Sequence, residues 1–187
     1  SCISARGAVS DYLVKSTKTA QTYILKHISV PESQKQVDAL LSTGAASSTE
    51  DAQKYYEQVV TDYREELETL EQLAASPNLD CFRSYQIEPK EYGVGFDIYL
   101  LAEHRTTLSE YLADNAITHL CAVNLAMDLC SALVDLRAAG LVHRDVKPEN
   151  IILRGAEAVL IDFDAARLHK PELENDTQIL GTTGFAA

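Results

Sequence analysis

The chain has 187 residues, 46% of them hydrophobic, so it is long enough to bury a core and short enough to form one structural domain. Its 28 acidic residues outnumber its 16 Lys and Arg residues. The resulting net charge of −12, without a basic tract, argues against nucleic acid and anionic membranes as partners. No apolar run approaches the roughly 20 residues that cross a bilayer, so we expect no membrane insertion and a cytoplasmic location, whether or not a longer protein carries an anchor.

Short apolar runs in the first half of the chain predict strands. Residues 12–14 and 23–30 are apolar on either side of a polar connection, which is typical of a β-hairpin. Residues 82–87 and 96–102 have the same character around a turn near Gly93. We expect this second pair to extend the sheet that the first pair begins.

Helical periodicity begins after residues 31–48, a small and polar stretch that we interpret as an insertion. The next segment carries an apolar residue every three or four positions and is predicted to be a helix that ends before Pro77. A short helix is expected near residues 108–112. Residues 119–139 are apolar almost all round, which predicts a deeply buried helix that ends at Gly140. Strands first and helices later indicate two lobes.

Two polar motifs flank a predicted hairpin in the last third of the chain. The run HRDVKPEN ends at Asn150, and after the hairpin the run IDFD carries Asp162. If residues 151–154 pair with residues 158–161, then Asn150 and Asp162 lie side by side, with their Cα atoms about 5 Å apart. An amide oxygen and a carboxylate that converge on one point suit a hard cation such as Mg²⁺. The sequence therefore predicts these two residues as metal ligands.

The first of these motifs also carries Asp145, five residues before Asn150. Its carboxylate can accept the proton of an attacking hydroxyl while Lys147 faces the negative charge that is transferred. Each short motif alone is weak, but packing does not explain both of them at this spacing. With both motifs, the chain closely resembles the protein kinase family. The resemblance implies ATP and Mg²⁺ as cofactors and a protein substrate.

The resemblance covers nearly the whole chain and implies an α+β, two-lobed protein-kinase-like fold. Residues 1–102 would form the N-lobe, an antiparallel sheet with one helix, and residues 103–106 would form the hinge. Residues 107–187 would form a mostly helical and incomplete C-lobe. The chain stops at Ala187, where the resemblance predicts a Pro-Glu pair, so we expect the later helices of the lobe to be absent from this sequence.

Several nucleotide-binding positions follow from the resemblance. Lys26 lies at the end of a predicted strand, where the family places the lysine that contacts the α- and β-phosphates. Glu66 lies on the inward stripe of the predicted helix, and because an inward carboxylate needs a cation, it is the expected partner of Lys26. The backbone at Glu103 and Arg105 would bind adenine. Ala102 would be a small gatekeeper, and Ile152 would form an apolar floor beneath the base. Ile24 would lie against the base, and Gly7 would be the glycine of the phosphate-binding loop.

Specificity for serine or threonine is suggested by Lys147, two residues after Asp145, and by Thr182, because tyrosine kinases carry a different loop there. Arg144 implies by resemblance that phosphorylation of the activation segment regulates the protein, since Arg can clamp a phosphate with two hydrogen bonds. The candidate acceptors are Thr177 and Thr183.

Three departures from the family keep a second hypothesis open. Gly7 alone remains of the glycine-rich loop, Ile24 replaces a small alanine, and Asp164 replaces the glycine of the D-F-G motif. These changes favour a pseudokinase, a nucleotide-binding or protein-interaction module without transferase activity. The enzyme is favoured by the polar residues of the family's site that this chain retains: Lys26, Glu66, Asp145, Lys147, Asn150 and Asp162. A small-molecule kinase is disfavoured because that group usually lacks the Arg144 and Lys147 signature.

Overall fold

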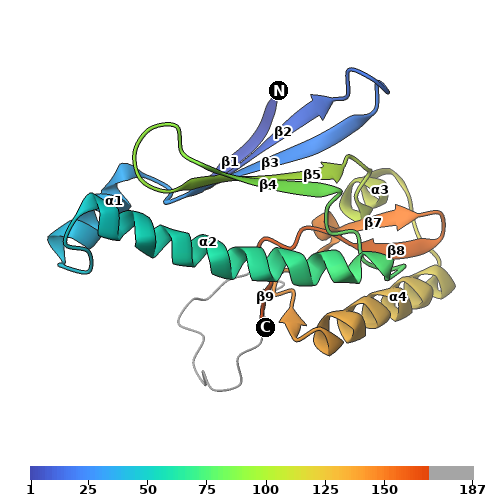
Figure 1. The fold of residues 1–187 in the computed structure, drawn as a ribbon. Helices are drawn as coiled ribbons and strands as arrows, with labels where there is room; N and C mark the ends of the chain where they lie inside the picture. The colour runs from blue at the N-terminus through green and yellow to red at the C-terminus, as the bar shows by residue number, and fades with distance from the viewer. Residues whose placement is uncertain (169–187) are drawn as a thin grey trace. The chain divides into compact units, whose positions relative to one another are not determined.

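The structure is a computed structural model, and it describes residues 1–168. The chain divides into two compact units (Figure 1). The first unit holds Ser1–Glu65 and Phe82–His104, and the second holds Glu66–Cys81 and the described residues from Arg105 onward. Strands dominate the first unit, whereas helices and short hairpins dominate the second.

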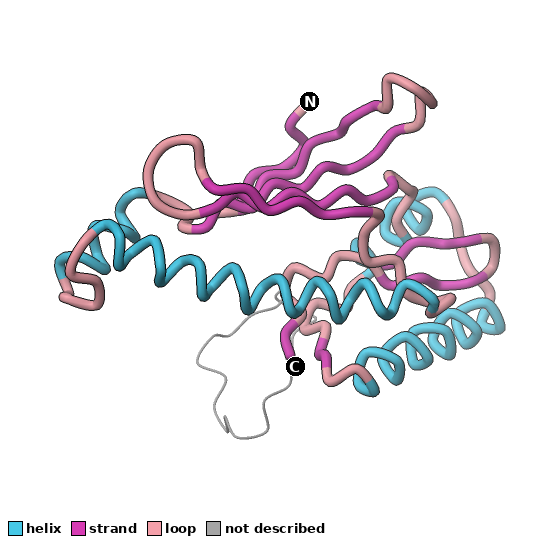
Figure 2. Tube along the Cα trace, in the orientation of Figure 1, coloured by secondary structure: helices cyan, strands magenta, loops and turns pink. Residues whose placement is uncertain are grey.

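Five antiparallel strands form the sheet of the first unit (Figures 1 and 2). They are β1 (Cys2–Arg6), β2 (Val9–Lys15), β3 (Thr22–Val30), β4 (Ser84–Pro89) and β5 (Phe96–Glu103). Their order across the sheet is β1-β2-β3-β5-β4. The two predicted strand pairs are confirmed as β2–β3 and β4–β5, and β5 joins them by pairing with β3.

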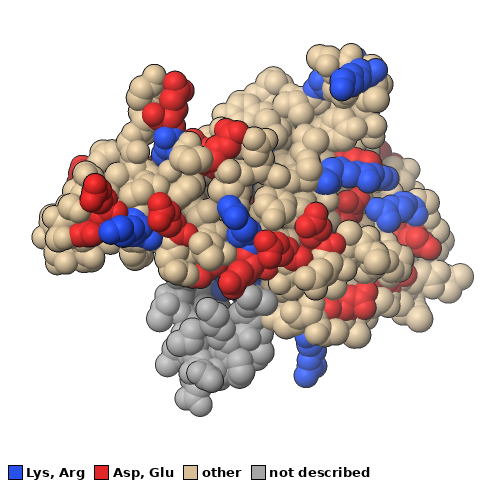
Figure 3. Space-filling model, viewed as in Figure 1, with Lys and Arg blue, Asp and Glu red and all other residues tan. Residues whose placement is uncertain are grey.

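Helix α2 (Thr49–Gln72) follows the periodicity seen in the sequence. It begins where predicted, because the backbone N–H of Asp51 donates to the Ser48 hydroxyl at 3.1 Å and so satisfies one free donor of the first turn. It ends before Pro77, also as predicted, and a short 3₁₀ turn follows it at Leu73–Ala75. The helix carries eight acidic and two basic residues, and Figure 3 shows acidic side chains along it.

Helix α1 (Gln34–Ser42) lies within the segment interpreted as an insertion and was not predicted from the sequence. Its inward residue, Val37, is 1% exposed and packs in a small core with Ala52 and Tyr56 of α2. The helix spans only nine residues, which is too short for its apolar periodicity to stand out within a small and polar stretch. Packing on α2 stabilises it more than its own propensity does.

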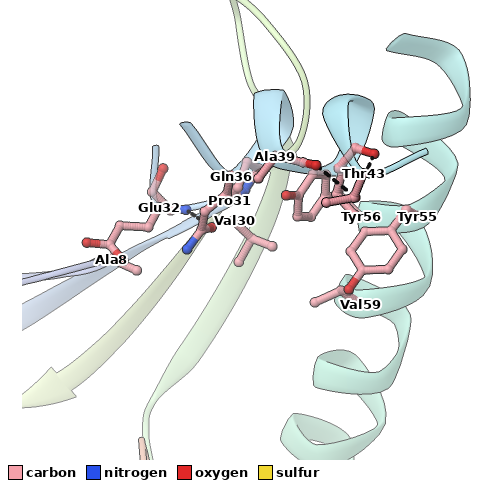
Figure 4. Close-up of a pocket in the computed structure, with 12 residues that line it drawn as sticks. Ala8, Val30, Pro31, Glu32, Gln36, Ala39, Thr43, Tyr55, Tyr56 and Val59 are labelled. Atoms are coloured by element: carbon pink, nitrogen blue, oxygen red, sulfur yellow. Dashed lines mark hydrogen bonds between the residues drawn. The ribbon is translucent and has the colours of Figure 1, made fainter. Parts of the chain in front are cut away.

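A groove of about 560 Å³ lies between the end of β3, helix α1 and the start of α2 (Figure 4). Its walls are mostly apolar and include Val30, Pro31, Tyr55 and Val59, while Glu32 contributes a carboxylate. The lining residues, all in the described part of the chain, include none of the residues predicted to bind nucleotide. The groove nevertheless borders the predicted glycine loop, because its lining includes Ala8, which follows Gly7, and Glu32, whose carboxylate lies 3.2 Å from where a Cβ atom on Gly7 would be.

The second unit is built around a hairpin of β7 (Ile151–Arg154) and β8 (Glu157–Leu160), which packs against helix α4 (His119–Ala138). The side-chain amide of Asn78 donates to the carbonyl of Ala158 at 3.0 Å, and the backbone N–H of Leu160 donates to the Asn78 carbonyl at 2.9 Å. These bonds attach the segment after α2 to the edge of β8. The other elements are short: α3 (Leu108–Asp114), β6 (Leu141–Val142), a 3₁₀ turn (Pro148–Asn150) and β9 (Arg167–Leu168), which pairs with β6.

The prediction that α4 is deeply buried is wrong. One stripe of the helix is buried, at Leu125, Ala132 and Leu136, whereas Leu120 is 71% exposed and Met127 is 64% exposed. The physical reason is that, among the described residues, the strands β8 and β6 pack on one side of α4 only. The predicted end of the helix is confirmed, because the chain leaves it through a glycine with φ of +74°.

By length and composition alone, α4 could also cross a membrane, contrary to the expectation from the sequence. That observation is weak evidence, because a helix in the core of a soluble protein passes the same test. Both acidic side chains of α4 make contacts within the unit. Asp128 accepts a hydrogen bond from the backbone N–H of Ala158 at 2.9 Å, and Asp135 accepts one from the Ser76 hydroxyl at 2.5 Å. These bonds make α4 a structural part of the second unit.

Candidate active site

The hairpin β7–β8 has a different register from the predicted one. Ile151 pairs with Leu160 and Arg154 pairs with Glu157, so the turn holds two residues rather than three. A two-residue turn with glycine first is a favoured hairpin geometry, and Gly155 has the required positive φ of +67°. The backbone N–H of Ile161 therefore donates to the carbonyl of Asn150 at 2.9 Å, and Asp162 lies one residue beyond the position predicted for it.

Asp145 is the centre of a compact polar cluster. Its carboxylate oxygen Oδ2 lies 2.7 Å from Nζ of Lys147 and accepts a hydrogen bond from the side-chain amide of Asn150 at 3.0 Å. The same amide also donates to the backbone carbonyl of Asp145 at 2.9 Å. The side chains of Lys147 and Asp145 are only 11% and 16% exposed, so water screens their attraction weakly. The geometry brings these three residues together, and their catalytic and metal-binding roles stay a prediction.

His143 connects this loop to the segment after β8. Its Nε2 lies 3.1 Å from the carbonyl oxygen of Ile161, and the backbone N–H of Asp145 lies 3.3 Å from its Nδ1. A neutral ring with its proton on Nε2 satisfies both contacts. Burial lowers the pKa of His143; the Ile161 carbonyl and the carboxylates of Asp162 and Asp145 oppose this effect. The ring is 1% exposed and meets the ring of Phe163 edge to face, with the ring centroids 4.9 Å apart.

Two residues in the segments next to this cluster have a left-handed backbone, which residues other than glycine rarely adopt. Arg144 has φ of +66° and Asp162 has φ of +64°. Such strained residues gather at functional sites, where the surrounding structure holds them in place. For Arg144, part of that support is a hydrogen bond of 2.8 Å from its Nε to the carbonyl of Ala165. The loop of Asp145 and the segment that follows Asp162 are therefore linked directly.

In the first unit, the predicted phosphate-contacting lysine lies on the more buried face of the sheet. Lys26 of β3 is opposite Asp11 of β2 and Leu100 of β5. Ile24 lies two residues away on the same face, opposite Ala102. The two residues predicted to surround the base are therefore direct neighbours, and both share a face with the lysine.

The other predicted residues of the nucleotide site are distributed over both units. Gly7 occupies the turn between β1 and β2 with φ of +56°, and Glu103 ends β5, where its carboxylate pairs with Arg83. Arg105 and Ile152 belong to the second unit, as does Glu66. The candidate acceptors Thr177 and Thr183, together with Thr182, lie outside the described residues.

Two charged residues that were not predicted from the sequence lie beside predicted site residues. Arg167 has its guanidinium 3.7 Å from the carboxylate of Glu66 in the second unit. Asp11 is the cross-strand neighbour of Lys26 in the first unit. No motif marks either residue, although pairing the two predicted strands of the first hairpin would have placed an acidic residue opposite the lysine.

Comparison with known proteins agrees with these motifs. The model of the protein kinase domain family matches residues 6–187. The chain belongs to this family. The predicted antiparallel N-lobe sheet and the α+β class of the kinase fold are confirmed by the structure and by this match.

Several curated serine/threonine kinases are similar to this kinase domain. Serine/threonine-protein kinase PkaB of Streptomyces coelicolor is 29% identical over 121 residues, which cover 59% of this chain and 28% of the relative. PkaA of the same organism is 37% identical over 86 residues, covering 43% of this chain and 16% of the relative. The probable kinase PknB of Corynebacterium glutamicum is 26% identical over 125 residues, covering 66% and 19%. The matched part spans less than a third of each of these relatives.

Proposed function

We propose that this kinase domain transfers the γ-phosphoryl group of ATP, with Mg²⁺, to serine or threonine of a protein substrate. The observation that carries the proposal is the cluster in which one carboxylate oxygen of Asp145 meets both Lys147 and Asn150. A general base must lie within hydrogen-bonding reach of a hydroxyl and keep its charge, and a nearby ammonium favours the charged form of a carboxylate. Structural packing alone does not call for three such polar side chains in one loop.

Each residue of the cluster has a distinct role in this proposal. Asp145 accepts the proton of the attacking hydroxyl, and Lys147 stabilises the negative charge on the transferred group. The side-chain amide of Asn150 points its nitrogen at Asp145, which leaves its carbonyl oxygen as the atom that suits a cation.

The donor set of Asn150 and Asp162 fits magnesium, which prefers oxygen ligands and is usually held by one or two protein groups. Among residues 1–168, no group of three or more His, Cys, Asp or Glu could hold a metal ion by itself. Phosphate oxygens and water would therefore complete the coordination. When bound, the ion would neutralise charge on the phosphates.

The remaining predicted positions would hold the nucleotide. Lys26 would contact the α- and β-phosphates, with Glu66 as its partner in the second unit. Gly7 would let the backbone approach the phosphates. The base would meet the backbone at Glu103 and Arg105, and three apolar side chains, Ile24, Ala102 and Ile152. Cytoplasmic location and control by phosphorylation of the activation segment belong to the same proposal.

The test is replacement of Asp145 by asparagine. We expect Asp145→Asn to lower incorporation of phosphate from ATP into a generic protein substrate by at least a hundredfold, because the proton acceptor is lost. Binding of MgATP, followed as a rise in melting temperature, should remain. Asp114→Asn removes an exposed carboxylate at the end of α3 and should leave both readouts unchanged. Equal incorporation by wild type and Asp145→Asn would remove Asp145 from its role.

The pseudokinase hypothesis is the second candidate, and the eroded glycine loop with Ile24 and Asp164 favours it. It predicts no incorporation by the wild-type protein under any metal condition. Stabilisation by ATP that requires Mg²⁺ favours the enzyme, whereas no stabilisation favours a pseudokinase. The same titration therefore separates the two hypotheses.

A further inference from the structure

Within the part of the chain that the structure describes, one carboxylate on the more buried face of the N-lobe sheet has an oxygen without a hydrogen-bond partner. Asp11 of β2 accepts a hydrogen bond from the Ser4 hydroxyl at 2.7 Å through its Oδ2. Its Oδ1 is buried from solvent and has no hydrogen-bond partner among residues 1–168. An unsatisfied buried oxygen of a carboxylate is costly, so its presence needs an explanation.

The position of this carboxylate is defined by the strand register. Ser4, Asp11, Lys26 and Leu100 form a row across four adjacent strands, because each is the direct partner of the next. Directly opposed residues of antiparallel strands share a face and have Cβ atoms about 4.5 to 5.5 Å apart. The carboxylate of Asp11 is therefore within reach of the place where the ammonium of Lys26 would meet a phosphate.

The surroundings of this charged row are apolar. On the same face, the cross-strand pair on one side of this row is Val9 with Ile28, and the pair on the other side is Leu13 with Ile24. Ile28 is buried, as is its β5 partner Ile98. Charges on such a face interact more strongly than charges in water, since little solvent screens them.

We infer that Asp11 lowers the affinity of this kinase domain for nucleoside triphosphates by placing a fixed negative charge beside Lys26. The inference rests on the proposed function, in which Lys26 contacts the phosphates. MgATP keeps a net negative charge, so a carboxylate on the same face repels it and also offsets the positive charge of the lysine. Asp11 acts through Lys26 and the phosphates and is a positioning residue rather than a catalytic one.

Replacement of Asp11 by asparagine tests this inference, because the amide keeps the size of the side chain and removes its charge. We expect Asp11→Asn to bind MgATP about tenfold more tightly than wild type in a calorimetric titration of the full 187-residue chain. Affinity for adenosine, which has no phosphate, should change by less than about twofold. This difference separates an electrostatic effect from a general change in the fold. Raising the salt concentration should reduce the gain for MgATP.

A matched control removes the same charge from the opposite face of the sheet. Asp97 of β5 pairs with Ser29, three residues from Lys26, and so points away from the lysine. Asp97→Asn changes the net charge by the same amount and should leave the MgATP affinity within about twofold of wild type. Asp11→Glu, which keeps the charge, should remain as weak as wild type.

The outcomes separate the inference from the proposed function. Equal MgATP affinity of wild type and a folded Asp11→Asn variant overturns the inference and leaves the proposed function standing. Tighter binding of MgATP and adenosine alike also overturns it, because the cause would then not be phosphate charge. If no variant binds MgATP, the proposed nucleotide site is wrong and the inference falls with it.

Discussion

His143 shows how a single buried side chain connects two segments of the candidate site. Its two ring nitrogens meet a carbonyl on one side and a backbone N–H on the other, and the ring packs on Phe163. A second ring proton would point at the N–H of Asp145, where two donors would face each other. The neutral form is therefore the form that fits the folded protein.

This fit predicts how stability depends on pH. Because burial lowers the pKa of His143 in the folded state, the unfolded chain binds this proton at higher pH. The stability that the neutral, buried His143 contributes is complete above about pH 6.5, the ordinary pKa of histidine, and is lost as the pH falls below that value. The free energy of unfolding, measured by urea titration between pH 7.5 and 5, should fall by at most about 1.4 kcal/mol per pH unit from this group.

His143→Gln is the comparison for that measurement, because its side-chain amide can still donate to the Ile161 carbonyl but does not titrate in this range. The variant should be less stable at pH 7.5 and should show a smaller loss of stability toward pH 5. Parallel pH profiles for the two proteins would show that the burial of this ring has no influence on acid sensitivity.

At the scale of elements, the hairpins and long helices follow from the sequence because their periodicity is carried by many residues. Register is less predictable, since a turn of two or three residues around Gly155 changes every pair in the hairpin. Asp145, Lys147 and Asn150 lie within one short loop, where spacing limits the geometry, so the sequence could place them near one another; their roles stay a prediction. The charged neighbour Asp11 was missed because its position depends on pairing with another strand.

The connection between β4 and β5 depends on a close approach that only glycine allows. Gly95 has φ of +113°, and a Cβ atom at this position would lie 2.1 Å from the carbonyl oxygen of Val30. Gly95→Ala should therefore lower the free energy of unfolding by about 3 kcal/mol or more, because backbone atoms must move. Thermal unfolding followed by circular dichroism measures the loss.

Gly93 in the same connection provides the matched control. It also has a positive φ, of +89°, but the nearest atom to an added Cβ is Oε1 of Gln34 at 4.0 Å. Gly93→Ala should cost only the backbone strain, roughly 1 to 2 kcal/mol. Similar losses for both variants would show that the contact with Val30 contributes nothing beyond the backbone conformation.

For the whole molecule, the sequence predicts which residues are apolar better than it predicts which surfaces are covered. The composition of α4 indicated burial on all sides, but burial depends on which neighbours pack on the helix. In the described chain, Leu120, Val123, Met127 and Val134 remain exposed along one side of it. Their spacing of three, four and seven residues places them on one stripe of the helix.

An exposed apolar stripe of this kind favours association, because burying it removes apolar surface from water. The 187-residue chain should therefore bind the dye ANS and elute from a sizing column as more than a monomer at tens of micromolar. Leu120→Gln combined with Met127→Gln should reduce both signals and change the free energy of unfolding by less than about 0.5 kcal/mol, as expected for surface positions. Leu125→Gln, on the buried stripe of the same helix, should instead destabilise the second unit by several kcal/mol. A monomeric wild-type chain that does not bind the dye would show that this side of α4 is covered in solution.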